Sequence, residues 1–145
     1  MSIKLKLDGF DDLFEQIKAA GGTVDNAAES CVKESAQIMH NELKAQMRKS
    51  DVDPDLIESM PPPEIEVDGN AYVARVGYKK GNYNPDNISD AHKVVFRNYG
   101  TPKRSKHGKI AAKGFIQRAK KKARPQINKS QQATLDKILG RLKSR

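Results

Sequence analysis

The sequence predicts an α+β fold, in which helices surround a small, mainly antiparallel sheet of three to four strands. Two long segments carry apolar residues at the helical period of 3.6. Residues 64–78 contain two alternating segments that flank a preferred hairpin turn pair. The strand patterns are grouped and do not alternate with helices, which is typical of α+β proteins. With 145 residues and no internal repeat, we expect a single domain over residues 1–145.

The first third of the chain is predicted to form a short strand and two helices. Residues 3–7 alternate apolar residues with lysine, as a strand does. Asp8 is a suitable N-cap for a helix over residues 9–20, which the glycines at 21–22 end. Thr23 or Asp25 then caps the longest helix, which continues to about Lys49. Its predicted stripe is Val24, Ala27, Ala28, Cys31, Val32, Ser35, Ile38, Met39, Leu43 and Met47.

The middle of the chain is predicted to be a loop followed by the sheet. Residues 50–63 contain four prolines, which exclude a regular helix or central strand, although residues 54–59 can form a short helical turn. Residues 64–67 and 71–78 are predicted strands around the turn pair Asp68-Gly69. Residues 92–99 are predicted as a third strand, because Val94, Val95 and Phe96 favour β structure, and this strand ends at Gly100.

The remaining segments are predicted as loops and C-terminal helices. Residues 79–91 and 101–113 are polar, and both are expected to be flexible loops. Helical periodicity returns after Gly114 and continues to Pro125. A last helix is predicted over residues 126–143, and Pro125 either begins it or makes a kink between two halves.

The charge distribution divides the chain into two parts. Residues 1–91 hold 10 Lys/Arg and 17 Asp/Glu, whereas residues 92–145 hold 17 Lys/Arg and one acid, Asp136. Such polarity suits proximity to DNA, or stacking of the basic part of one subunit on an acidic neighbour. The alternative is that the basic residues only keep the protein soluble.

Composition also limits the cellular setting. No segment approaches the roughly 18 apolar residues of a membrane span, and residues 1–7 lack the apolar run of a signal peptide. A single cysteine allows no intrachain disulfide. We therefore expect synthesis in a reducing cytoplasm and no contact with a membrane.

The sequence offers no catalytic or metal-binding cluster. The three histidines, His40, His92 and His107, fall in different predicted elements, and Cys31 lies on the apolar stripe of the long helix, where a buried thiol is expected. Residues 51–55 alternate aspartates as a calcium loop does, but Pro54 intrudes and the glycine and distal glutamate are missing. No glycine-rich phosphate loop is present. We therefore expect a non-enzymatic protein without a cofactor or metal.

Basic residues are concentrated after Gly100. Such a cluster can neutralise phosphates and predicts a salt-dependent, sequence-independent affinity for nucleic acid. Tyr99 and Phe115 are the nearby aromatics, and both are interpreted as structural, so no stacking platform for single strands is evident. The cluster comprises Lys103, Arg104, Lys106, His107, Lys109 and Lys113 in the predicted loop, then Arg118, Lys120, Lys121, Lys122 and Arg124 in the helix.

Two segments resemble a phage family. Residues 94–101 read Val-Val-Phe-Arg-Asn-Tyr-Gly-Thr, and residues 114–119 read Gly-Phe-Ile-Gln-Arg-Ala. An aromatic-Gly-Thr segment, a loop and a Phe-led helix with a small residue four positions on are similar to the neck, or head–tail joining, proteins of long-tailed bacteriophages. These are also called tail-component or tail-completion proteins. The long early helix, residues 53–60 in place of a Gly-x-Leu-x-x-Ser segment, and a strand ending near Gly77 agree with it.

The resemblance covers about residues 8–140, with two departures. Arg97 and Asn98 replace the usual acidic residue before the aromatic-Gly-Thr segment. The proline often present in the Phe-led segment is absent, and Arg118 precedes Ala119. Both departures concern the details of a subunit interface.

The resemblance implies a structural virion protein. Members of the family are thought to form a ring, typically of six subunits, between the head-closure ring and the tail tube. A homo-oligomeric ring, head-closure and tail-terminator or tail-tube proteins as partners, and a place in the virion neck are implied. The implied subunit or ring contacts are Phe96, Tyr99, Gly100, Thr101, Phe115 and Arg118. The implied contacts with packaged DNA in the channel are Lys103, Arg104, Lys106, Lys109 and Lys113.

Three other functions stay open at the level of sequence. A tail terminator, which caps the tail tube before head joining, is barely separated from a neck protein. A nonspecific DNA-binding protein would use the same basic residues. A small enzyme such as a nuclease would need a metal-ligand cluster that the sequence does not provide.

Overall fold

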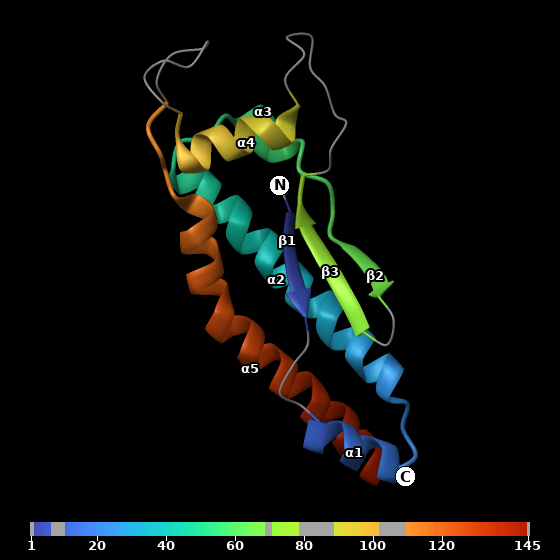
Figure 1. The fold of residues 1–145 in the computed structure, drawn as a ribbon. Helices are drawn as coiled ribbons and strands as arrows, with labels where there is room; N and C mark the ends of the chain where they lie inside the picture. Colours follow the sequence, from blue (N-terminus) through green and yellow to red (C-terminus); the bar gives the residue numbers. More distant parts are fainter. Residues whose placement is uncertain (1, 7–10, 69–70, 79–88, 102–109, 145) are drawn as a thin grey trace.

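The computed structural model describes residues 2–6, 11–68, 71–78, 89–101 and 110–144. It has an α+β fold, which confirms the predicted class, with a long pair of helices beside a small sheet (Figure 1). The elements, in chain order, are β1 (Ser2–Lys6), α1 (Asp11–Ala19), α2 (Val24–Lys49), α3 (Pro54–Glu58), β2 (Glu64–Asp68), β3 (Ala71–Gly77), α4 (Asp90–Tyr99) and α5 (Phe115–Lys143).

The described strands form one antiparallel sheet with the order β1-β3-β2. Ile3 lies opposite Val76, and Ile65 lies opposite Ala74, so these side chains share the face that covers the core. The predicted strand at the start of the chain and the predicted hairpin are thus confirmed. Asp68 is paired with Ala71, so the connecting positions are 69 and 70, which lie outside the described residues. The predicted turn pair at 68–69 was therefore wrong by one position.

Helices α2 and α5 run side by side in opposite directions along the length of the molecule, and the sheet lies on α2 next to α5 (Figure 1). The end of α2 is fixed by a Schellman pattern of backbone hydrogen bonds, in which Asp51 N donates to Arg48 O at 3.2 Å and Val52 N donates to Met47 O at 3.1 Å. Asp51 takes the left-handed conformation, with φ 53°, that this pattern requires. The chain can then turn back into α3.

A buried polar layer separates two apolar clusters along the α2–α5 seam. Gln131 Nε2 donates to Ser35 Oγ at 3.0 Å, and Ser35 Oγ donates to Cys31 O at 2.7 Å. On one side, the larger cluster includes Met39, Leu43 and Phe115 together with the inner face of the sheet. On the other side, where α1 contacts α2 and α5, the smaller cluster contains Ile17, Ala27, Cys31, Leu135 and Leu139.

The predicted strand over residues 92–99 is wrong, because this segment forms the helix α4. Ser89 is its N-cap, and the Ser89 hydroxyl accepts a hydrogen bond from His92 N at 3.3 Å. The buried residues are Ala91, Val94 and Asn98, which follow a helical and not a two-residue period. The capping residue and this spacing outweigh the β propensity of the adjacent valines.

Pro125 does not begin a separate helix, which was one of its two predicted roles, since it lies inside the single helix α5. A buried position recurs every four residues on both sides of the proline, so one face packs continuously against α2. Pro125 is exposed, so the hydrogen bond that its missing N–H removes lies on the solvent side. The buried residues of α5 are Phe115, Ile116, Ala119, Ala123, Gln131, Leu135 and Leu139.

Several predicted features fall partly outside the described residues. The Asp8 cap is outside them, and so are residues 79–88 and 102–109 of the two predicted loops. Of the remaining loop positions, residues 89–91 cap and begin α4, while Thr101 and Ile110 are hydrogen-bonded to each other. The predicted turn after Asp53 is confirmed as α3, whose first N–H groups Asp53 caps. Among the described residues, no helix is long and apolar enough to cross a membrane.

Candidate functional site

The junction between α4 and α5 is held together by hydrogen bonds and a close backbone approach. We use "α4–α5 junction" for residues 94–101 and 110–119, which include both segments of the sequence resemblance. Helix α4 ends at Gly100, whose φ of 79° and ψ of 177° belong to a region that only glycine readily adopts. A Cβ at Gly100 would lie 2.8 Å from Ile110 O and 2.9 Å from Ala112 N. The two chain segments can approach this closely only because residue 100 has no side chain.

Thr101 and Ile110 close the base of the segment between them. Thr101 N donates to Ile110 O at 2.9 Å, and Ile110 N donates to Thr101 Oγ1 at 2.7 Å. Four of the predicted DNA contacts fall on residues 102–109, outside the described part of the chain: Lys103, Arg104, Lys106 and Lys109. Both ends of this basic segment are thus held at one point of the fold.

Asn98 fixes the beginning of α5. Asn98 O accepts a hydrogen bond from Gly114 N at 3.0 Å, and Asn98 Oδ1 accepts one from Ile116 N at 2.8 Å. The N-cap position of α5 is Gly114, which has no side chain of its own to offer. Asn98 therefore acts as a cap from another helix, satisfying an N–H group that would otherwise be buried without an acceptor. Among the described residues, Asn98 Nδ2 is buried without a hydrogen-bond partner.

Two cations of the junction bind the end of α2. Lys113 Nζ donates to Ser50 O at 2.5 Å, and Arg118 Nη2 donates to Ser50 Oγ at 2.5 Å. Arg118 Nη1 also donates to Lys113 O at 2.6 Å. The C-terminal end of a helix attracts cations, so these contacts are electrostatically favourable as well as geometric. In this conformation Lys113, a predicted DNA contact, is occupied by an intramolecular bond.

The predicted interface residues have different surroundings. The Phe115 side chain is fully buried in the larger apolar cluster, so it contributes to this subunit's core and offers no surface to a neighbour. Phe96 is half-buried and its ring stacks on His92 with the centroids 6.3 Å apart. Tyr99 is 58% exposed, which makes it one of two large exposed apolar side chains in the described residues, together with Val67. Arg118 is exposed, and Gly100 and Thr101 are half-buried.

Three exposed cations of α5, Lys120, Lys121 and Arg124, form a basic face next to the junction. Lys122 is also exposed, but it lies on the other flank of the helix, beside Lys49. A hydrogen bond from Lys122 and then its charge lower the pKa of Lys49, at the end of α2. Two ammonium groups therefore lie close together there, an arrangement that an added anion would stabilise. The sequence predicted the cations of α5 but gave no sign that Lys49 lies beside them, because the contact depends on tertiary packing.

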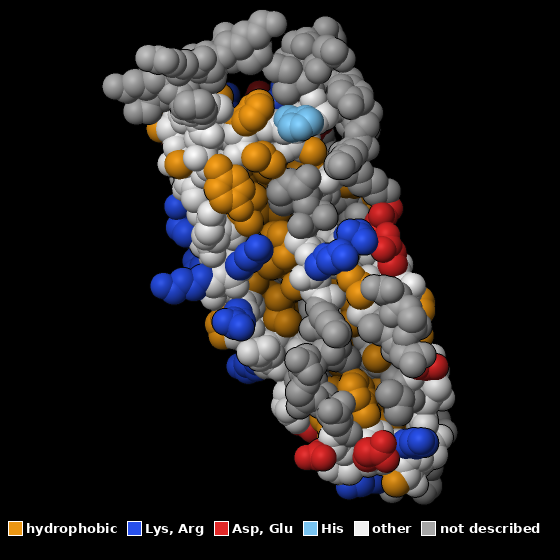
Figure 2. Space-filling model, in the orientation of Figure 1, with side chains coloured by type: hydrophobic (Ala, Val, Ile, Leu, Met, Phe, Trp, Pro, Cys, Tyr) orange, Lys and Arg blue, Asp and Glu red, His pale blue; other side chains and the backbone are white. Residues whose placement is uncertain are grey.

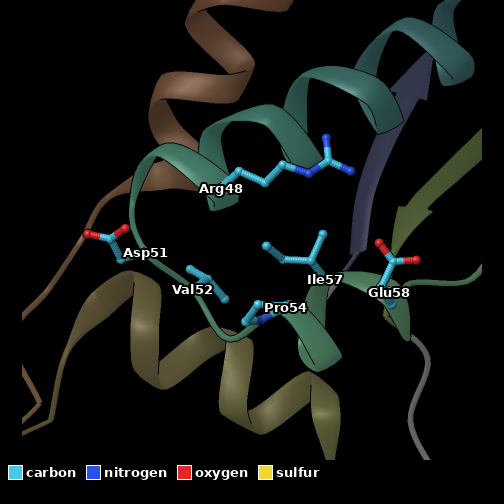
Figure 3. A pocket seen from close by; sticks show the side chains of 6 residues that line it. All are labelled: Arg48, Asp51, Val52, Pro54, Ile57 and Glu58. Carbon is cyan, nitrogen blue, oxygen red and sulfur yellow. The ribbon is translucent and has the colours of Figure 1, made fainter.

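A pocket lies where the end of α2 packs against α3. Its volume is about 440 Å³, and Val52, Pro54 and Ile57 form its apolar part. The Arg48 guanidinium lies on the side where Glu58 is, and Asp51 lies at the opposite side (Figure 3). The charged residues that line it are thus one cation, Arg48, and two acids, Asp51 and Glu58.

Burial shifts the pKa of two titratable side chains in the described core. Burial, and then the charge of Glu34, raises the pKa of the Cys31 thiol from 9.0 to about 11, so it is protonated at neutral pH. Burial and then the charge of Lys44 lower the pKa of His40, whose Nδ1 is buried and has no hydrogen-bond partner among the described residues. The His40 side chain is only 8% exposed. Within the described ranges no three His, Cys, Asp or Glu side chains gather as metal ligands.

Comparison of the chain with protein-family models, with curated proteins and with solved structures found no match.

Proposed function

We propose that this protein is a structural virion subunit that forms a ring in the neck of a long-tailed bacteriophage and joins the DNA-filled head to the tail. The α4–α5 junction carries this proposal. The two sequence segments that resemble the phage family are 20 positions apart at their starts, and they form one hydrogen-bonded unit around Gly100, Asn98 and Thr101. A rigid base that holds both ends of a basic segment suits a contact element between rings.

The surface of the junction supports a role in assembly. Tyr99 is 58% exposed at the end of α4, immediately before the basic segment. Exposed aromatic residues are enriched at protein interfaces, because they bury a large area with little loss of side-chain entropy. Tyr99 and the cations that follow it would meet neighbouring ring proteins, and some of these cations would face DNA in the channel.

The charge polarity supports ring formation. Contacts in a ring join two different surfaces of identical subunits, and complementary charge helps to specify such a contact. The exposed cations of α5 form one surface, whereas exposed acids such as Asp12, Asp55 and Glu66 lie on α1, α3 and β2. An acidic surface of one subunit would dock on the basic face of the next. The protein would be made in the host cytoplasm and reside in the virion.

The test is electron microscopy of particles from a phage that carries a nonsense mutation in this gene. A neck role predicts DNA-filled heads and separate tails of normal length. Tails of uncontrolled length would assign the protein to the tail terminator, and intact infectious virions would exclude both functions.

Complementation then tests the junction itself. A variant in which residues 102–109 are replaced by a Gly/Ser linker should fold, since the Thr101–Ile110 pair is kept, but should not restore infectivity. A matched variant with Lys103, Arg104, Lys106 and Lys109 all changed to glutamine separates loss of charge from loss of the segment. Full infectivity with the linker variant would contradict the proposed contact role.

Nonspecific DNA binding is the second candidate, favoured by the adjacent ammonium groups of Lys49 and Lys122. This pair would hold a phosphate between two cations, one on α2 and one on α5. Its test belongs to the molecule as a whole and is given in the Discussion.

A further inference from the structure

A groove runs between the sheet and α5 on the face shown in Figure 2. Its volume is about 720 Å³, and it lies between the edge strand β1 and the middle of α5, from Lys120 to Gln131. Twelve residues of α helix rise about 17 Å, which matches roughly five residues of extended chain. The groove is therefore as long as a short peptide strand.

The floor of the groove is apolar. Met39 of α2 is 1% exposed and Ile3 of β1 is 6% exposed, and half-buried Leu5 and Ile127 lie beside them. Apolar side chains run down the middle of this face, with Lys and Arg on both sides of them (Figure 2). Such a floor favours a partner that presents apolar side chains on one side.

The rim of the groove is basic. Four of the lining residues are cations, Lys4 from β1 and Lys120, Lys121 and Arg124 from α5, and none is acidic. In the described part of the chain, ion pairs join Lys33 to Glu29 and Arg75 to Glu66, and neither pair involves a rim residue. The rim therefore concentrates positive charge that this chain's own described carboxylates do not neutralise.

One wall of the groove is the open edge of a sheet. Among the strands that the structure describes, β1 is hydrogen-bonded to β3 on one side, and the order β1-β3-β2 leaves its other side without a strand. An open edge presents N–H and C=O groups on which an extended peptide can add as a further strand. The backbone of β1 would provide affinity, while the apolar floor and basic rim would select the sequence.

We propose that this groove binds an extended acidic peptide segment of a partner protein, which adds to β1 as a fourth strand. Its acidic and apolar residues alternate, because successive side chains of a strand point to opposite faces. The apolar residues contact Met39 and Ile127, and the carboxylates contact Lys4, Lys121 and Arg124. This inference depends on the groove alone and stands or falls independently of the proposed place in a phage neck.

The test uses the whole protein and a fluorescein-labelled synthetic peptide, Glu-Val-Glu-Ile-Glu-Val-Glu. Fluorescence anisotropy should show saturable binding that weakens with added salt. The double variant K121E/R124E should bind the peptide at least tenfold more weakly, since it replaces two attractive charges by two repulsive ones. The matched control K129E/K137E changes the same charge at exposed positions of α5 outside the groove and should bind like the unaltered protein.

Three further results decide the mode of binding. A peptide N-methylated at the alternate residues whose N–H groups face β1 should fail to bind. Hydrogen exchange should slow at whichever of Lys4 and Leu5 has its N–H at the open edge when the unmodified peptide is added. Equal binding by K121E/R124E and its control, or by the N-methylated peptide, would overturn the proposal. Duplex DNA binding that only K121E/R124E loses, without peptide binding, would assign the groove to nucleic acid instead. Self-association that the peptide prevents would assign it to a second copy of the chain and equally overturn the proposal.

Discussion

Single residues at the α4–α5 junction control how two distant segments meet. Gly100 and Gly114 both have a positive φ, of 79° and 62°, but for different structural reasons. A Cβ at Gly100 would collide with backbone atoms of residues 110 and 112, whereas the nearest atom to a Cβ at Gly114 is Arg118 Nη1, 3.6 Å away. The two glycines thus separate the effect of backbone conformation from that of close approach.

Gly100→Ala should therefore be much more destabilising than Gly114→Ala. We expect a loss of about 3 kcal/mol in the free energy of unfolding for Gly100→Ala, from a glycine-only conformation and a backbone clash together. Gly114→Ala should lose about 1 kcal/mol, from the left-handed conformation alone. Urea unfolding of both variants measures this difference. Equal losses would show that the close approach of residues 100 and 110 is not maintained in solution.

At Cys31, burial should make stability depend on alkaline pH. The pKa of this thiol is raised in the folded protein from 9.0 to about 11, so the folded state retains a proton that the unfolded state loses. The contribution of the protonated thiol to the free energy of unfolding is complete below pH 9. It is lost, by on the order of 2 kcal/mol, as the pH rises towards 11. Urea unfolding at several pH values should show a steeper decline for the unaltered protein than for Cys31→Ala. Parallel pH profiles would contradict this role.

At the scale of elements, regular patterns were predictable from the sequence and tertiary capping was not. Helix α2, the hairpin of β2 and β3, and α3 follow apolar periods and local caps, so their predictions were correct to within a few residues. Helix α4 was mistaken for a strand because Val94, Val95 and Phe96 favour β structure, while Ser89 and the spacing of Ala91, Val94 and Asn98 indicate a helix. The prediction that Pro125 could begin a helix was wrong, because the exposure of this residue inside α5 could not be read from the sequence.

The candidate site was predicted in its residues more than in its geometry. Tyr99, Gly100 and the basic residues after them were identified from the sequence, and Gly100 and Thr101 do lie at the centre of the junction. Phe115 was assigned to an interface although it is fully buried. The roles of Asn98 and Ser50 depend on segments 16 or more residues away, and no local pattern indicates such contacts.

The beginning of α5 should depend on a side chain from α4. Asn98→Ala removes the acceptor for the buried Ile116 N–H and should lower the free energy of unfolding by about 2 kcal/mol. Asn98→Asp keeps an acceptor and places negative charge at a helix N-terminus, so its loss should be smaller. Urea unfolding of both variants measures these losses. A loss for Asn98→Asp as large as that for Asn98→Ala would contradict the importance of the cap.

At the scale of the whole molecule, positive charge is concentrated in residues 92–145. DNA binding through this part of the chain would depend strongly on salt concentration. We expect sequence-independent duplex binding that weakens steeply with salt, as release of counterions from phosphates requires. Changing Lys49 and Lys122 to glutamine should weaken binding and reduce the slope of log affinity against log salt by about 0.9 per lost phosphate contact. The variant K129Q/K137Q is the matched control. An unchanged slope in K49Q/K122Q would exclude this pair as a phosphate site.

The buried polar layer between Ser35 and Gln131 has a mechanical consequence. If α2 slid along α5 by one turn, the Gln131 amide would face Cys31 or Met39 and lose its hydrogen bond to Ser35, at a cost of about 1–3 kcal/mol. The layer therefore opposes sliding of the two helices along each other. Helix α5 has 29 residues and is about 43 Å long. A force applied along the helices at the α1 end would therefore act on α2 and α5 together, as far as the α4–α5 junction.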